Sequence, residues 1–165
     1  MSVAFFGDGA MQQGILYESM NMAALWDLPV LFVCINNQYG MGTRIDRATR
    51  DVAFDKRAEA FGLGHAMVDG EDVEEVFAAA QGLMDKARAG RPGYMAVSCF
   101  RFFGHGREDK SPYRTAEGEE IGRKRDPIAR ARKHIPDRGL ASEAVLDRID
   151  SCGPPDDDHG CRSGR

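Results

Sequence analysis

What this 165-residue sequence lacks excludes several classes of protein. It contains no apolar run of about 18 residues, so we expect no transmembrane helix. It does not open with a basic segment followed by a long apolar stretch, and we therefore expect no signal peptide. The excess of positive charge typical of nucleic-acid-binding proteins is also missing, since the formal net charge is −4. The sequence predicts a protein that binds neither membranes nor nucleic acids.

The chain has four cysteines, and it lacks the cysteine spacing of a zinc site. Cys34 and Cys99 lie in apolar runs, where we expect buried free thiols. Cys152, His159 and Cys161 could be metal ligands or ordinary residues of a polar tail, and we favour the tail. This pattern predicts a reduced, cytoplasmic protein.

The residues that are present are ordinary for one globular domain, with 42% hydrophobic and 29% charged. Short apolar runs alternate with amphipathic ones. These runs predict strands at 3–6, 30–35, 65–70 and 94–100, and helices at 11–26 and 52–61. A third helix is expected after Asp72, stopped by Gly90-Arg91-Pro92. We expect loops at 40–50 and 101–116. The alternation predicts an α/β fold, a parallel sheet with helices on both faces.

Two of the predicted helices have clear apolar stripes. The helix at 11–26 places Leu16, Met20 and Ala23 on one side. Asp72 is expected to cap the helix that follows it, with Glu75 three positions on completing a capping-box pattern. We expect the apolar face of this second helix to consist of Val73, Val76, Phe77, Ala80 and Leu83.

The turn Gly7-Asp8-Gly9 follows the first predicted strand directly. The glycines would let the backbone turn tightly and approach a ligand. The amides of Gly9 and Ala10 would lie at a helix N-terminus, which favours an anion such as phosphate. A carboxylate in the same turn repels phosphate unless a cation lies between them. The turn therefore indicates Mg²⁺ shared between Asp8 and a phosphate.

Asn37 is the expected second oxygen ligand. It follows the apolar run 30–35, and parallel strands end at the same edge of a sheet. An Asp-Gly turn and an Asn-Asn pair are each common structural features without function. Their joint occurrence at one predicted edge favours a metal site, although a generic phosphate-binding α/β protein stays open as an alternative.

Residues 7–43 resemble a known family. The spacing from Gly7-Asp8-Gly9 to Asn36-Asn37 is similar to the thiamine diphosphate-binding motif. The stretch GAMQQGILYESMNMAALWDLPVLFVCINNQYGMGT resembles the alpha subunit of the decarboxylating component of 2-oxo acid dehydrogenase complexes, which act on pyruvate, branched-chain 2-oxo acids or acetoin. The resemblance extends over residues 2–150 and implies a partial thiamine-diphosphate-binding fold.

The resemblance also implies roles for individual residues. Mg²⁺ would be bound by the side chains of Asp8 and Asn37 and by the main-chain carbonyl of Tyr39. Met41 would lie beneath the cofactor and hold it bent. The residues implied to bind thiamine diphosphate are Gly7, Asp8, Gly9, Ala10, Asn37, Tyr39, Met41 and His105.

The segment CFRFFGHGREDKSPYRT resembles the family's active-site loop and makes His105 the catalytic histidine. A histidine between two glycines can titrate near neutrality and donate to an anion. Judged by its neighbours alone, His105 would be a solvated loop residue. Family members from mammals carry regulatory serines where Arg44 and Gly106 stand, so we expect no such control here. The loop is more similar to bacterial acetoin-type enzymes.

The resemblance implies partners: a beta subunit in an alpha2beta2 heterotetramer, and a lipoyl acyltransferase. Gly14, Glu18 and Asn21 share one helix face, where the family has a subunit contact. Family alpha subunits have a long preceding segment. We therefore interpret residues 1–150 as the C-terminal portion of the cofactor-binding domain, and 151–165 as an unstructured tail arising from truncation or an altered reading frame. The alternative is a subunit remnant or interaction module without turnover.

Overall fold

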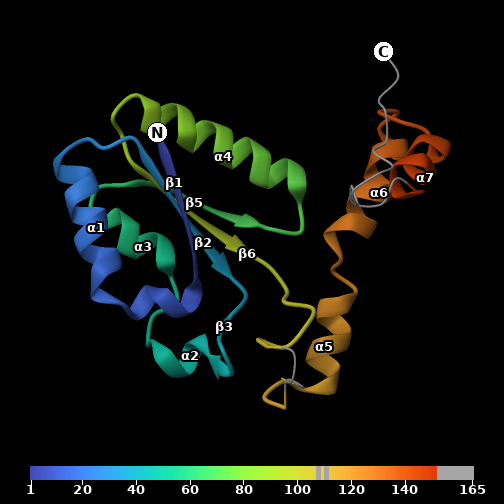
Figure 1. Cartoon of the computed structure of the whole chain (residues 1–165), viewed down its shortest axis with the longest axis horizontal. Coiled ribbons are helices and arrows are strands. Elements are labelled where there is room, and N and C mark those ends of the chain that lie inside the picture. The colour runs from blue at the N-terminus through green and yellow to red at the C-terminus, as the bar shows by residue number, and fades with distance from the viewer. Residues whose placement is uncertain (107–108, 110–111, 152–165) are drawn as a thin grey trace, which may run out of the picture. The chain divides into compact units, whose positions relative to one another are not determined.

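A computed structural model describes residues 1–106, 109 and 112–151 of the chain (Figure 1). It divides into two compact units, Met1–Pro127 and the part from Ile128 onward. The first unit is built on a four-stranded sheet in the order β1-β2-β6-β5, with every pair parallel. The strands are β1 (Ser2–Gly7), β2 (Val30–Asn36), β5 (Gly64–Asp69) and β6 (Gly93–Ser98). The predicted parallel α/β fold is confirmed.

Helices cover both faces of this sheet, as predicted (Figure 1). Helices α1 (Gly14–Leu25) and α3 (Phe54–Glu59) lie on one face, and α4 (Val73–Arg88) lies on the other. Side chains alternate along a strand. Phe32 therefore packs with α1 and α3, while its neighbour Leu31 packs with α4.

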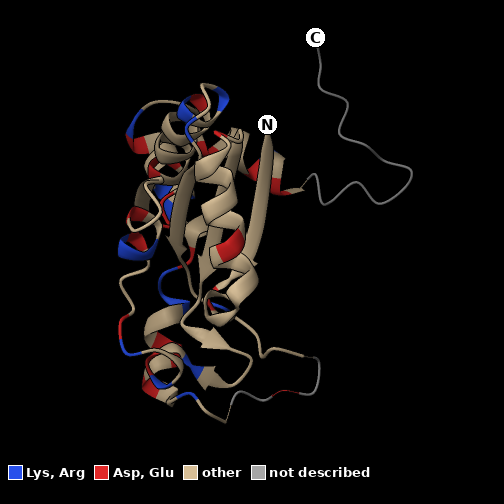
Figure 2. Cartoon of the chain, turned by 90° about the vertical axis from the view of Figure 1, so that its left-hand side faces the viewer, with Lys and Arg blue, Asp and Glu red and all other residues tan. Residues whose placement is uncertain are grey.

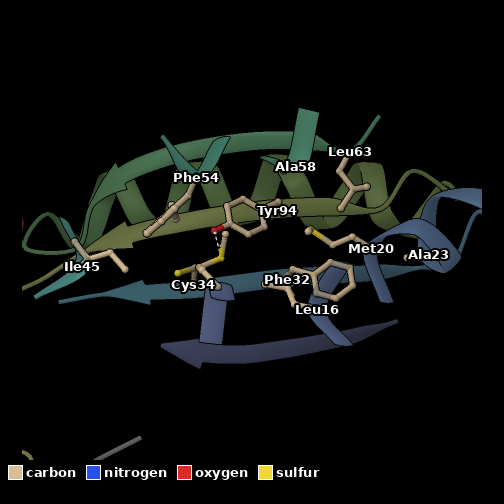
Figure 3. Packing of buried hydrophobic residues seen from close by; sticks show 12 residues of the cluster. Leu16, Met20, Ala23, Phe32, Cys34, Ile45, Phe54, Ala58, Leu63 and Tyr94 are labelled. Carbon is tan, nitrogen blue, oxygen red and sulfur yellow. Dashed lines mark hydrogen bonds between the residues drawn. The ribbon is translucent and has the colours of Figure 1, made fainter. Parts of the chain in front are cut away.

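The core beneath α1 and α3 is centred on Tyr94, which is fully buried (Figure 3). The Tyr94 hydroxyl donates to the sulfur of Met11 at 3.3 Å. Burial raises the pKa of the nearby Cys34 thiol to about 12, so this cysteine is the inert buried thiol expected. The predicted stripe of Leu16, Met20 and Ala23 is buried in the same cluster.

The single helix predicted at 11–26 is wrong at its start. A 3-10 helix η1 (Asp8–Gln12) comes first, and α1 begins only at Gly14. Gln13 between them is extended. The helix breaks here because the Met11 carbonyl accepts hydrogen bonds from the side chains of Tyr17 and Arg57 instead of from the next turn of backbone.

The loop predicted at 40–50 contains regular structure. Strands β3 (Tyr39–Gly40) and β4 (Thr43–Arg44) form an antiparallel pair, and α2 (Ile45–Ala48) follows directly. Ile45 is buried in the core cluster that holds Met11 and Phe54. This one apolar side chain anchors a segment whose composition otherwise indicates a loop. The described residues of 101–115 lie outside helices and strands, whereas 107–108 and 110–111 are outside the described residues.

Helix α4 follows its prediction at the cap and departs from it along its apolar face. Asp72 accepts hydrogen bonds from the amides of Glu74 and Glu75, as predicted. Leu83 is buried, but Val73 and Phe77 are exposed, against the prediction. The helix packs on β2, β5 and β6. Val73 and Phe77 are 62% and 67% exposed, so they lie largely outside the part of the helix surface that packs on these strands.

The rest of the chain is helical. Helix α5 (Ala116–Arg123) belongs to the first unit, and its N-cap Thr115 accepts a hydrogen bond from the Gly118 amide. Helices α6 (Pro127–Asp137) and α7 (Glu143–Ser151) follow. Within the second unit, Arg132 pairs with three acidic residues of α7, Glu143, Asp147 and Asp150.

Across the described ranges, we find no helix long and apolar enough to cross a membrane. Residues 152–165, which include Cys152, His159 and Cys161, lie outside the described residues.

We predict that Leu83→Ala and Phe77→Ala have very different effects on stability. Leu83 is 4% exposed, and truncating it leaves a cavity that should lower the free energy of unfolding by about 2–5 kcal/mol. Phe77 is 67% exposed, and its truncation should change that free energy by no more than about 0.5 kcal/mol. Urea denaturation of both variants checks this. A larger loss for Phe77→Ala would contradict the packing of α4 described here.

Candidate cofactor site

Three neighbouring strands end together at one edge of the sheet. Strand β2 lies between β1 and β6, with Gly7 beside Ile35 and Asn36 beside Ser98. None of these three strands contains Lys, Arg, Asp or Glu, so charged residues are found only where the chain leaves them (Figure 2). Asp8, Asn37 and Cys99 consequently follow the ends of adjacent parallel strands. The structure thus places Asp8 and Asn37 at the same edge, as expected.

Asp8 is the unusual residue at this edge. It is 1% exposed, and neither of its carboxylate oxygens has a hydrogen-bond partner among the described residues. Burial raises the pKa of Asp8 above its usual value. The backbone amides of Asp8 and Asn37, which lie near the carboxylate without the geometry of a hydrogen bond, and the charge of Arg101 act in the opposite direction. A buried carboxylate without partners is costly. Its two oxygens are available to a cation.

The chain after β2 forms two consecutive turns closed by asparagine side chains. Asn36 Oδ1 accepts from the Gln38 amide at 3.0 Å, and Asn37 Oδ1 accepts from the Tyr39 amide at 3.1 Å. Gln38 is held with a positive φ of 66°. The Gln38 carbonyl accepts from the Ile45 amide at 2.9 Å, which ties these turns to α2. These turns fix the backbone from Asn37 to Tyr39, and strand β3 packs against η1, the helix that begins at Asp8.

Gly9 lies against the backbone of the β3–β4 hairpin. A Cβ added at Gly9 would come within 3.2 Å of the Gly40 Cα, and one added at Gly40 would meet Gly9 at 3.3 Å. These two glycines let the Asp8 turn and the hairpin touch. Gly7 is different, because it is extended and a Cβ there would meet nothing within 4 Å. The expected tight turn at Gly7 is therefore absent.

Met41 and His105 line a cavity of about 620 Å³. Arg101 donates to the Met41 carbonyl at 2.9 Å and to the Tyr113 hydroxyl at 2.6 Å. The Tyr113 hydroxyl and the His105 amide both donate to Asp109, at 2.7 and 2.8 Å. This network connects the histidine loop to the hairpin turn, where Met41 has a left-handed φ of 56°.

Asn37 and Tyr39 also line a larger cavity of about 700 Å³, which lies against α5. The Arg114 guanidinium in its wall lies 5.3 Å from the centre of the Tyr39 ring and 5.0 Å from that of Phe100. Arg114 also donates to the Arg101 carbonyl at 2.6 Å. The wall contains four arginines in all, Arg44, Arg47, Arg114 and Arg125. Two of them pair with carboxylates, Arg44 with Asp46 and Arg125 with Asp69 and Glu71.

The predicted site residues fall into two groups. Asp8, Gly9 and Asn37 meet at the sheet edge, and Met41 meets His105 in the smaller cavity. Among the described residues, no hydrogen bond joins His105 to Asp8, and neither of the two cavities above is lined by both. The connection is Arg101, a residue that sequence reasoning missed. Its position inside the aromatic-Arg-aromatic pattern before His105 was the available signal.

Metal sites built from acidic, histidine or cysteine side chains alone are absent from the part of the chain that the structure describes, since no group of three such residues could hold an ion. Any metal bound beside Asp8 must use amide or carbonyl oxygens in addition. His65 is the second residue of β5, at the end of the strand opposite the carboxyl edge of the sheet.

The family model described as "Dehydrogenase E1 component" matches residues 1–152. The chain belongs to the dehydrogenase E1 component family. Its relatives include proteins named "Pyruvate dehydrogenase E1 component subunit alpha". That of Rhizobium meliloti (strain 1021) is 41% identical over 152 residues, covering 91% of this chain and 44% of the relative. That of Rickettsia felis is 40% identical over 147 residues, covering 88% of this chain and 45% of the relative.

A third relative with the same name, from Zymomonas mobilis, is 41% identical over 151 residues, covering 90% of this chain and 42% of the relative. The chain thus spans somewhat under half the length of these curated relatives.

Asp8→Asn is expected to stabilise the metal-free chain near neutral pH. The native pKa of Asp8 is raised above the unfolded value of 3.8, so the wild-type carboxyl contributes its full stability below pH 3.8 and loses it as the pH rises through the native pKa. The variant's advantage in free energy of unfolding should therefore appear as the pH rises. Urea denaturation in EDTA across this range measures it.

Asp51→Asn is the control for this experiment. A hydrogen bond from the Ala53 amide, followed by the charge of Lys56, holds the pKa of Asp51 below its usual value. Its substitution should therefore destabilise the chain at neutral pH, the opposite sign. Destabilisation by Asp8→Asn in EDTA would show that the carboxylate has a partner.

Proposed function

We propose that this chain binds Mg²⁺ and thiamine diphosphate as part of the alpha subunit of a 2-oxo acid dehydrogenase. The observation that carries the proposal is the buried carboxylate of Asp8, which has two oxygens without partners and lies beside Asn37 in a member of the dehydrogenase E1 component family. A generic phosphate-binding α/β protein would have no need to bury a carboxylate at its phosphate site.

The residues at the sheet edge fit Mg²⁺. This ion prefers oxygen ligands in octahedral geometry and is commonly shared with substrate phosphates. Asp8 would supply a carboxylate, Asn37 an amide oxygen and Tyr39 its main-chain carbonyl. The amides of Gly9 and Ala10 in the first turn of η1, next to Gly7, would donate to the diphosphate.

When bound, thiamine diphosphate supplies the electron sink that loss of CO₂ from a 2-oxo acid requires. Met41 would support the cofactor from the hairpin turn. Its left-handed backbone is costly for a residue other than glycine, and the hydrogen bond from Arg101 to its carbonyl helps to hold it. His105 is exposed at the smaller cavity, which Met41 also lines. There its imidazole can donate a hydrogen bond to a substrate carboxylate.

The relatives' names support pyruvate as the first substrate to test. Acetoin is the second candidate, because the loop GHGREDKSPYR resembles that of acetoin-type enzymes. The family supports a beta subunit, in an alpha2beta2 heterotetramer, and a lipoyl acyltransferase as partners. Phe5 on the edge strand β1 is 71% exposed. Ile15 on α1 and Trp26, the residue that follows α1, are also exposed, as expected of surfaces that another chain covers. A cytoplasmic location stays a prediction.

The alternative is a subunit remnant without turnover. The exposed side of β1 agrees with it as well as with a partner chain, because Val3 and Phe5 point to the face that α4 covers elsewhere in the sheet and are 39% and 71% exposed. Cofactor binding separates both proposals from an unrelated phosphate-binding protein, and turnover with a beta subunit separates them from each other.

We predict that Asp8→Asn and Asn37→Ala each weaken Mg²⁺-dependent binding of thiamine diphosphate. Loss of a charge-assisted contact costs about 1.5–3 kcal/mol, or roughly 10- to 150-fold in Kd. Titration calorimetry with and without Mg²⁺ measures the effect. Asn36→Ala is the matched control, since Asn36 closes the neighbouring turn but is not a proposed ligand. Equal losses for Asn36→Ala and Asn37→Ala would contradict the assignment.

We also predict that the chain alone does not decarboxylate pyruvate, branched-chain 2-oxo acids or acetoin at a useful rate. The assay uses an artificial electron acceptor, first with the chain alone and then with a candidate beta subunit. In the mixture, His105→Ala should lower turnover by about 10²-fold. Phe103→Ala, an exposed position on the same loop, should have little effect. Robust turnover by the chain alone would rule out a site shared between two subunits.

A further inference from the structure

Arg57 lies outside the proposed cofactor site yet contacts the two segments that form it. It is a half-buried residue of α3, and its guanidinium lies 5.4 Å from the centre of the Phe54 ring. It makes no described hydrogen bond to Asp8, Asn37 or Tyr39. Neither the proposed metal binding nor the proposed chemistry uses it.

One terminal nitrogen of the Arg57 guanidinium, Nη1, binds the end of η1. Nη1 donates to the Met11 carbonyl at 3.0 Å and to the Tyr17 hydroxyl at 2.7 Å, and that hydroxyl donates to the same carbonyl at 2.5 Å. Carbonyls at the end of a short helix lack backbone partners, and a charged donor satisfies them strongly. Met11 lies three residues after Asp8, within the same 3-10 helix.

The other terminal nitrogen, Nη2, binds the segment that follows α2. Nη2 donates to the Thr49 hydroxyl at 2.5 Å and to the Asp51 carbonyl at 2.9 Å. The Thr49 amide donates to the Ile45 carbonyl at 3.0 Å, and Ile45 follows the β3–β4 hairpin directly. One guanidinium therefore bridges the segment that carries Asp8 and the segment that carries Tyr39 and Met41.

We propose that Arg57 is a positioning residue that clamps these two segments and so sets the place of Asp8 relative to the hairpin. The inference rests on the proposed function for its consequence in cofactor binding. The clamp requires a planar fork, because four acceptor groups on two segments must be reached from one side chain. Lysine, with a single ammonium group, cannot reach both sides at once.

The first test is hydrogen exchange in the cofactor-free chain. In Arg57→Gln, amides of 8–12 and 45–51 should exchange roughly 10-fold faster than in the wild type, which corresponds to about 1.4 kcal/mol at 25 °C. Amides of the central strands, 30–36 and 93–98, should keep their protection. Arg50→Gln is the matched control, because its side chain makes no hydrogen bond or ion pair with a described residue. Equal exchange of 8–12 and 45–51 in the two variants would overturn the proposal.

Two milder variants each remove one hydrogen-bond partner of Arg57, one from Nη1 and one from Nη2. They keep the test decisive if Arg57→Gln does not fold. Tyr17→Phe should speed exchange at 8–12 only, and Thr49→Val should speed it at 45–51 only. Arg57→Lys should restore one segment at most. Both segments loosening together in Tyr17→Phe and also in Thr49→Val would indicate general destabilisation and would count against the clamp.

The second test is binding of thiamine diphosphate at saturating Mg²⁺. Arg57→Gln should raise the Kd roughly 10-fold, and Arg50→Gln should leave it unchanged. An unchanged Kd with loosened segments would reject the positioning role. If the wild-type chain binds no thiamine diphosphate, the proposed function fails, while the exchange pattern still decides whether Arg57 holds the two segments together.

Discussion

The buried carboxylate of Asp8 is the constraint on which the rest of this structure depends. A carboxylate that is removed from water and accepts no hydrogen bond of normal geometry destabilises the fold, so the surrounding chain has to hold it in place. The sheet does so by continuing apolar strands up to the residue before Asp8. The backbone amides of Asp8 and Asn37 and the charge of Arg101 then lower the cost of ionisation. Everything charged at this edge begins where the apolar strands stop.

The two faces of the sheet have different tasks. The face under α4 is an ordinary apolar layer of side chains such as Leu31, Val33 and Leu83, and none of the candidate site residues belongs to it. The face under α1 and α3 contains Met11 and Ile45, which belong to the segments on either side of the candidate site. Core packing and site geometry therefore share residues on one face only.

Local sequence patterns predict those features of the structure that depend on residues close together in the sequence. The four strands, the cap at Asp72 and the shared edge of Asp8 and Asn37 follow from periodicity, capping chemistry and parallel topology. The break between η1 and α1 could not be predicted, because it depends on Arg57, 46 positions after Met11. The hairpin at Tyr39 depends on Gly40 meeting Gly9. Phe77 has helical spacing suited to a core, but it is largely exposed.

Met11 links the hydrophobic core to the candidate site, because it lies in the same 3-10 helix as Asp8. Its sulfur accepts the Tyr94 hydroxyl at the centre of the core, while its carbonyl is held by Arg57 and Tyr17. A change of side-chain volume at this position would be transmitted along η1 to Asp8. The two faces of the sheet therefore differ in how freely their buried side chains can be replaced. The layer around Leu83 can be repacked with the sheet as a barrier, whereas any exchange at Met11 alters the core and the carboxylate together.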